Sequence, residues 1–118
     1  MTDLIACVSS GKGTWGHVQR LINEQDWGKI VLITDEFGKE NFKAEKKAEY
    51  ILIDPNQFLP DLIEDIHKKL ENRLTGTEVA INFISGSGKE HMAILSAILK
   101  LGMGIRLVAL TKEGIKEV

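Results

Sequence analysis

The sequence predicts an α/β fold, a three-layer sandwich built on a mainly parallel sheet of five strands in the order 3-2-1-4-5. Two observations carry this prediction. Short, continuously apolar runs recur along the chain, as is typical of strands covered on both faces. Segments with helical spacing of apolar residues separate these runs, so that strands and helices alternate. At 118 residues, we expect the whole chain, 1–118, to form one ligand-binding domain.

The first strand and the first helix are expected near the start of the chain. Residues 4–8 are all apolar and predict the strand, and the polar loop 9–14 follows it. A helix is expected over 15–25, because four large apolar residues recur there at helical spacing. These four residues are Trp15, Val18, Leu21 and Ile22.

The second and third strands flank a segment with few apolar residues. The strands are expected at 29–34 and 49–54, and Pro55 closes the later one. Residues 35–38 break the second strand. Between them and the third strand, residues 39–47 carry several lysines and glutamates, so we expect a short solvated helix or a loop there.

The longest helix is expected over 57–74. Its apolar residues form one stripe, and charged residues occupy the remaining surface. Gly76 follows it and is suited to the helix C-terminus. The stripe consists of Phe58, Leu59, Leu62, Ile63, Ile66, Leu70 and Leu74.

One more helix and two more strands complete the alternating pattern. A strand is expected at 78–84, and the loop 85–89 leads from it into a helix at about 90–101. The fifth strand is expected at 105–110. The tail, 111–118, is short and charged, and no element is predicted for it.

Two loops of serine, glycine and lysine follow the first and fourth strands. They read Ser9-Ser10-Gly11-Lys12-Gly13 and Ser85-Gly86-Ser87-Gly88-Lys89. Glycine lets backbone N–H groups approach an anion closely, and the helix that begins after each loop adds a favourable dipole. In an open parallel sheet, ligands bind beyond the carboxyl ends of the strands where the strand order reverses, here between strands one and four. We therefore expect the two loops to line one anion-binding crevice.

His91 stands beside the second loop. An imidazole there could bind phosphate or transfer a proton, although an exposed histidine in the first turn of a helix is the simpler interpretation. Ser9 or Ser10 could act as a nucleophile, but no Ser/His/Asp set can be identified from spacing alone.

Other interpretations of the loops stay open. Neither has the spacing of a Walker A motif. The dinucleotide pattern Gly-x-Gly-x-x-Gly runs from Gly11 to Gly16, and Asp35 lies where an acidic residue would bind a ribose hydroxyl. Alternatively, both loops are only tight turns, with glycines for chain reversal and serines as helix N-caps.

Composition argues against several classes of partner. The formal net charge is −2, without the basic excess of a surface that binds extended nucleic acid. No apolar stretch reaches the length of a membrane helix, and no signal peptide is apparent. Cys7 is the single cysteine, which fits a reducing compartment, so we expect a cytoplasmic protein. The three histidines lack metal-ligand spacing, and neither metal nor cofactor is expected.

The segment from Asn82 to Lys89 resembles a motif of the CRISPR-associated Rossmann fold (CARF) domains. In that family, an Asn-x-Thr-Gly-Gly-Thr-Lys-like turn after strand four opens a helix, and a Thr/Ser-rich turn follows strand one. Here one extra residue separates Asn82 from Lys89, and Gly-Ser-Gly replaces the Gly-Gly pair. As an architecture, the resemblance covers most of the chain. It implies a Rossmann-like sensor of cyclic oligoadenylate, a nucleotide of antiviral defence.

The resemblance also implies an assembly and a possible reaction. Family members form homodimers whose two-fold ligand site would be lined here by residues 9–12 and 85–89. Some stand-alone relatives cleave the ring without a metal, by attack of a ribose 2′-hydroxyl on the adjacent phosphate. In that alternative, Lys89 would stabilise the phosphorane and Ser10 would orient the phosphate or the hydroxyl. The two alternatives are therefore a non-catalytic sensor and a ring nuclease.

Overall fold

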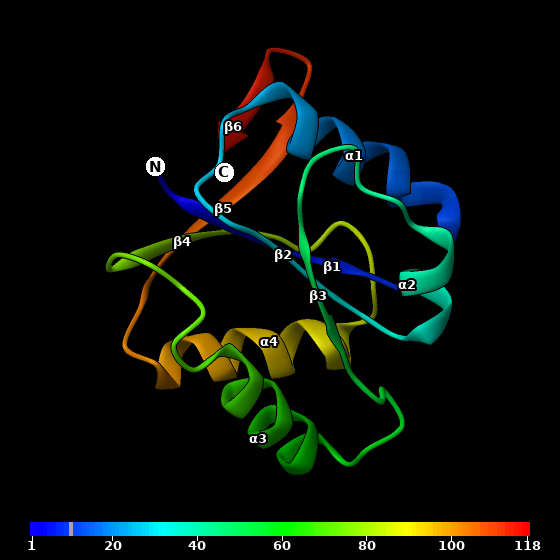
Figure 1. Cartoon of the computed structure of the whole chain (residues 1–118), viewed down its shortest axis with the longest axis vertical. Coiled ribbons are helices and arrows are strands. Elements are labelled where there is room, and N and C mark those ends of the chain that lie inside the picture. Colours follow the sequence, from blue (N-terminus) through cyan, green and yellow to red (C-terminus); the bar gives the residue numbers. More distant parts are fainter. Residues whose placement is uncertain (10) are drawn as a thin grey trace.

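The computed structural model describes residues 1–9 and 11–118. Its centre is a sheet of six strands in the order β3-β2-β1-β4-β5-β6 (Figure 1). The strands are β1 (Asp3–Val8), β2 (Ile30–Thr34), β3 (Glu49–Leu52), β4 (Glu78–Asn82), β5 (Gly104–Thr111) and β6 (Gly114–Glu117). Strands β1 to β5 pair in parallel, and β6 pairs antiparallel with β5. The predicted Rossmann-like α/β fold and the order of its first five strands are confirmed.

Helices cover both faces of the sheet. Helices α1 (Trp15–Glu24) and α2 (Glu36–Asn41) lie on one side, and α3 (Leu59–Leu70) and α4 (Gly88–Lys100) pack together on the other (Figure 1). A single 3₁₀ turn, η1 (Lys12–Thr14), precedes α1. None of these helices in the described part of the chain is long and apolar enough to cross a lipid bilayer.

The alternation of side chains along β1 explains why its residues 4–8 are all apolar. Ile5 and Cys7 belong to the buried cluster beneath α3 and α4, whereas Leu4, Ala6 and Val8 belong to the cluster beneath α1. Successive side chains of a strand point to opposite faces, so the stretch of a central strand that helices cover on both faces is apolar on both. The interpretation of 4–8 as a doubly covered strand is confirmed.

The C-terminal tail corrects the sequence-based expectation, because it forms β6. Thr111 and Gly114 are paired across a two-residue turn, and Gly114 has a φ of 101°, which favours glycine. Ile115 packs against the cluster beneath α1. The strand was missed because two of its four residues, Lys116 and Glu117, are charged and exposed, which leaves little apolar signal.

The segment between β2 and β3 also differs from expectation. Helix α2 begins at Glu36, inside the residues expected to break the second strand. It begins there because the Asp35 side chain accepts a hydrogen bond from Gly38 N at 2.8 Å and caps the helix. Gly38 fits there because a Cβ would collide with the Thr34 hydroxyl. The other boundaries shift less. The long helix α3 is shorter than the expected 57–74, and α4 begins two residues before the expected start.

Candidate functional site

Strands β1 and β4 are parallel neighbours at the centre of the sheet, with Ala6 opposite Asn82. Their carboxyl ends therefore lie at the same edge, where the strand order reverses. The loops that follow are in contact, since Ser9 N donates a hydrogen bond to Ser85 Oγ at 3.2 Å. We call these segments the paired loops: residues 9 and 11–14 after β1, and residues 83–89 after β4. The adjacency on which the predicted crevice depends is confirmed.

A buried carboxylate joins the paired loops. Ser9 Oγ donates to Glu90 Oε1 at 3.3 Å, and Ser87 N donates to the same oxygen at 2.8 Å. Ser9, Ser85 and Glu90 are all buried, with at most 4% of each residue exposed. Glu90 thus connects the loop after β1 with the first turn of α4.

Helix α4 begins with a capping box. The Ser87 hydroxyl accepts a hydrogen bond from Glu90 N, and the Glu90 carboxylate accepts one from Ser87 N. The N-cap alternative therefore holds for Ser87. The Glu90 carboxylate also offsets the positive end of the helix dipole. Sequence reasoning did not select Glu90, although the spacing Ser87-x-x-Glu90 is the signature of this motif.

The loop after β1 is built differently. Gly11, Lys12 and Gly13 are exposed, and Gly11 has a φ of 99°. Among the described residues, neither η1 nor α1 has an acidic residue in its first turn, and neither N-cap makes a side-chain hydrogen bond. The positive end of α1 is therefore not offset by a carboxylate in its own first turn. Of the paired loops, this one offers the better environment for an anion.

Trp15 fixes this loop to the start of α1. Its Nε1 donates to Ser9 O at 3.0 Å, and its ring is buried against Phe42. The Lys12 ammonium lies 5.9 Å from the centre of the Trp15 ring and 5.5 Å from that of Phe37. Lys12 thus makes cation–π contacts with Trp15 in α1 and Phe37 in α2.

The Lys89 side chain leaves the paired loops. Its Nζ donates to Pro55 O, after β3, at 2.9 Å. Lys12 and Lys89 therefore point to different neighbours, α2 and the segment after β3. A cavity of about 480 Å³ at that segment is lined by Asp35, Glu36 and Asp54, together with three apolar residues, so it does not attract an anion. The remaining lining residues are Leu52, Ile53 and Pro55.

His91 supports the turn after β4. Its Nε2 donates to Ser85 O at 2.7 Å, and its ring stacks on Phe83 with a centroid distance of 4.7 Å and an interplanar angle of 15°. The imidazole is half-buried and is not a free side chain on the first turn. Its position allows it to orient the turn, which any ligand between the loops would meet.

Gly86 and Cys7 pack against each other beneath this turn. Gly86 has a φ of 103°, and a Cβ there would lie 2.6 Å from Cys7 Sγ and 3.1 Å from His91 Nε2. Burial strongly raises the pKa of the Cys7 thiol, and the charges of Glu90 and Asp35 raise it further. Cys7 therefore stays a neutral thiol that packs and does not act as a nucleophile.

Asn82 and His17 form a second polar link that sequence reasoning missed. Asn82 Nδ2 donates to Val108 O at 2.9 Å and lies 3.2 Å from His17 Nε2, which also accepts from Leu110 N at 3.2 Å. Burial lowers the pKa of His17, and Arg20 lowers it further. This link ties α1 to β4 and β5. No local signal could have paired residues 65 positions apart.

Two further interpretations of the sequence concern the side chains of Asp35 and Ser10. Asp35 caps α2, so the acidic residue expected to hold a dinucleotide ribose is already engaged. Ser10, expected in the site and as an orienting residue, lies outside the described residues. Across residues 1–9 and 11–118, no group of three histidine, cysteine, aspartate or glutamate side chains is arranged to hold a metal ion.

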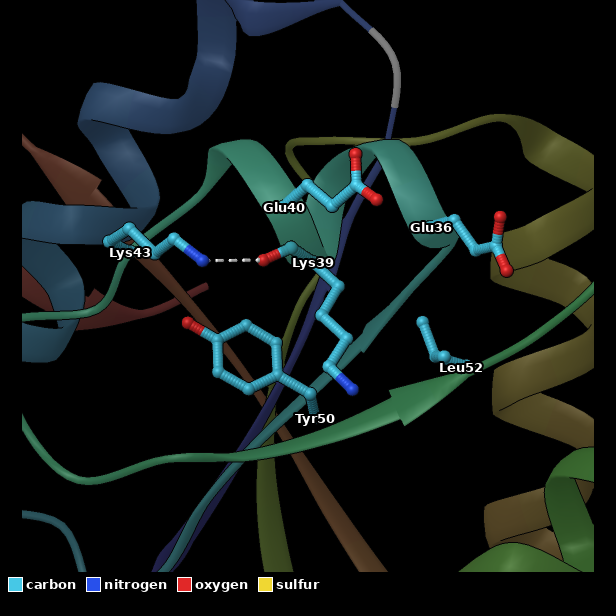
Figure 2. A pocket seen from close by; sticks show the side chains of 6 residues that line it. All are labelled: Glu36, Lys39, Glu40, Lys43, Tyr50 and Leu52. Carbon is cyan, nitrogen blue, oxygen red and sulfur yellow. Dashed lines mark hydrogen bonds between the residues drawn. The ribbon is translucent and has the colours of Figure 1, made fainter.

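A further groove lies between α2 and β3, two strands from β1 (Figure 2). Its volume is about 390 Å³, and its charged lining consists of two lysines and two glutamates, which balance. The Tyr50 hydroxyl within it already donates to Phe42 O and accepts from Ala44 N. Nothing in the groove selects a ligand. Its lining residues are Glu36, Lys39, Glu40, Lys43, Tyr50 and Leu52.

Comparison with protein-family models gives no match, and comparison with curated proteins gives none either.

Proposed function

We propose that this protein binds a phosphate-containing nucleotide, of the cyclic oligoadenylate class, between the paired loops. The observation that carries the proposal is the meeting of two Ser/Gly/Lys loops at the reversal of strand order, joined from Ser9 N to Ser85 Oγ. Ligands of open α/β sheets bind at this position. The phosphate goes to residues 11–13, where exposed backbone and Lys12 meet a helix start without a carboxylate in its first turn.

The proposal favours sensing over cleavage. Lys89, the cation of the ring-nuclease alternative, donates its hydrogen bond to Pro55 O, away from the paired loops. Binding without turnover in the cytoplasm, as a relay of a nucleotide signal, is the function we propose.

The proposal includes a homodimer with the ligand on its two-fold axis. Apolar side chains are exposed on the turn after β4 and along α4, at Ile84, Met92 and Leu99. Ile84 belongs to the paired loops, and Met92 and Leu99 continue the exposed apolar face along α4 away from them. Such a face suits a contact between two copies, because a two-fold interface repeats one patch. The dimer would then bring two sets of paired loops to one ligand.

A thermal-shift screen tests the proposal. The probes are cyclic tetra-adenylate, cyclic hexa-adenylate, linear tetra-adenylate and inorganic phosphate. A ligand at 100 times its Kd adds about 2.7 kcal/mol to the free energy of unfolding and raises the melting temperature. Chromatography of the nucleotides after incubation without metal should return them intact. Absence of a shift with every probe would leave the paired loops as turns only, and cleavage lost in Lys89→Ala would establish the ring nuclease.

A further inference from the structure

One oxygen of the buried Glu90 carboxylate has no partner among the described residues. Oε1 accepts hydrogen bonds from Ser9 Oγ and Ser87 N. Oε2 is buried and, within residues 1–9 and 11–118, makes no hydrogen bond. The whole residue is 4% exposed. A carboxylate only accepts hydrogen bonds, so its unpaired oxygen calls for a donor from elsewhere.

This oxygen belongs to a carboxylate that lies within the proposed binding site. The carboxylate lies at the first turn of α4, between the loops that follow β1 and β4. The turn that covers it, residues 86–89, is exposed. Bonds from Ser9 and Ser87 fix the carboxylate orientation without using Oε2, which makes it a preorganised acceptor for a group that enters between the loops.

The charge of Glu90 decides which part of a nucleotide meets it. A phosphate oxygen is repelled by the carboxylate and goes to residues 11–13 instead. A hydroxyl can donate to it, and carboxylates bind ribose hydroxyls in dinucleotide sites. The other acidic candidate, Asp35, caps α2 through Gly38 N. Glu90 also caps its helix, but its carboxylate joins the two paired loops, which makes it the better-placed acceptor for a sugar hydroxyl.

We propose that Glu90 Oε2 accepts a hydrogen bond from a ribose 2′-hydroxyl of the bound nucleotide, and that this contact selects ribonucleotides over deoxyribonucleotides. The inference rests on the proposed function, because it assigns a group of that ligand to a residue that neither the motif nor the resemblance includes. It divides the site into an anion end at the loop after β1 and a hydroxyl end at α4.

Calorimetric titration with two probes tests the inference: linear tetra-adenylate and its 2′-deoxy counterpart. We expect the deoxy probe to bind the wild-type protein about tenfold or more weakly, since a charged hydrogen bond is lost. In Glu90→Gln the ratio of the two affinities should fall towards one. Glu113→Gln, in the hairpin between β5 and β6, should retain the wild-type ratio. Urea unfolding of each variant checks that it folds.

The outcomes separate the two proposals. Equal affinities of the wild type for both probes would overturn the assignment of Glu90 and leave nucleotide binding intact. Discrimination that persists in a folded Glu90→Gln would also overturn it. Absence of binding to either linear probe would overturn the assignment of Glu90, and absence of binding to cyclic tetra-adenylate as well would overturn the proposed function. A wild-type affinity ratio near one overturns the assignment even if Glu90→Gln does not fold.

Discussion

Gly86 packs against the end of β1 with a backbone conformation that other residues rarely adopt. Its φ is 103°, and a Cβ would lie 2.6 Å from Cys7 Sγ, inside van der Waals contact. Both the backbone and the packing therefore require glycine at this position. The turn after β4 depends on this one residue.

We expect Gly86→Ala to lower the free energy of unfolding by about 1–3 kcal/mol, because it adds backbone strain and a steric contact. Gly13→Ala is the matched control. Gly13 has a negative φ, and among the described residues no atom lies within 4 Å of the point where an alanine methyl group would stand. Its substitution should therefore change stability little. Urea denaturation measures both, and equal stabilities of the two variants would contradict the account.

The buried contacts of His17 should make the stability of the protein depend on pH. Burial lowers its pKa below 6.5, and in the folded protein its Nε2 accepts from Leu110 N. The unfolded chain therefore binds the proton more readily, and stability falls as pH drops below 6.5 towards the folded pKa. Above pH 6.5, this contribution is fully present.

The pH prediction compares wild type with His17→Gln by urea unfolding at pH 7.5 and pH 5. Wild type should lose more stability between the two values, since the other titrating groups are common to both proteins. The loss caused by those groups cancels in the difference. An identical loss in both proteins would show that His17 is not held neutral by its buried contacts.

At the scale of elements, α4 carries the most informative local signal. Its capping box ties helix initiation to the same Glu90 that connects the paired loops. Removing the Ser87 hydroxyl leaves Glu90 N without its partner. Helix start and site geometry are thus set by one small group of side chains.

Ser87→Ala should lower the free energy of unfolding by about 1 kcal/mol, the usual cost of losing an N-cap. Ser87→Asn is the matched control, because asparagine caps about as well as serine. Chemical denaturation distinguishes them. A stability of Ser87→Ala equal to wild type would mean that α4 does not need its cap.

The elements that the sequence predicts well are those with strong, local patterns. The five apolar strands and the stripe of α3 were recognisable because burial on two faces or on one stripe leaves a periodic signal. The start of α2 was missed because its cap, Asp35, coincides with the end of β2. The edge strand β6 was missed because only one of its side chains, Ile115, packs inward on the α1 cluster.

The candidate site was predictable at the level of loops but not of side chains. The pairing of residues 9–13 with 85–89 follows from strand order, a global rule. The directions of Lys12 and Lys89 and the link from Asn82 to His17 depend on distant partners. Such contacts form only when the fold is complete, so no spacing along the chain encodes them.

At the scale of the whole molecule, the proposed dimer should be visible in solution. Light scattering should give a mass of about twice the 13.1 kDa of the chain. Leu99→Asp, on the exposed face of α4, should shift the protein to a monomer, because burying a charge in the interface is costly. Phe58→Asp is the control, since Phe58 is 82% exposed but lies outside α4. A wild-type monomer, with or without nucleotide, would contradict the dimer.

The topology of the molecule leads to one central claim, that the paired loops bind a phosphate-containing nucleotide. Strand order brings the loops together, and the loop after β1 keeps an exposed lysine and a helix start without a carboxylate in its first turn. Lys100, at the opposite end of α4 from these loops, provides a matched lysine that should not contribute.

Calorimetric titration with cyclic tetra-adenylate tests this claim most directly. We predict saturable binding to the wild-type protein, a Kd about ten- to a hundredfold weaker in Lys12→Ala, and an unchanged Kd in Lys100→Ala, since a charged contact contributes about 1.5–3 kcal/mol. Absence of binding to wild type, or equal weakening by both lysine substitutions, would contradict the account.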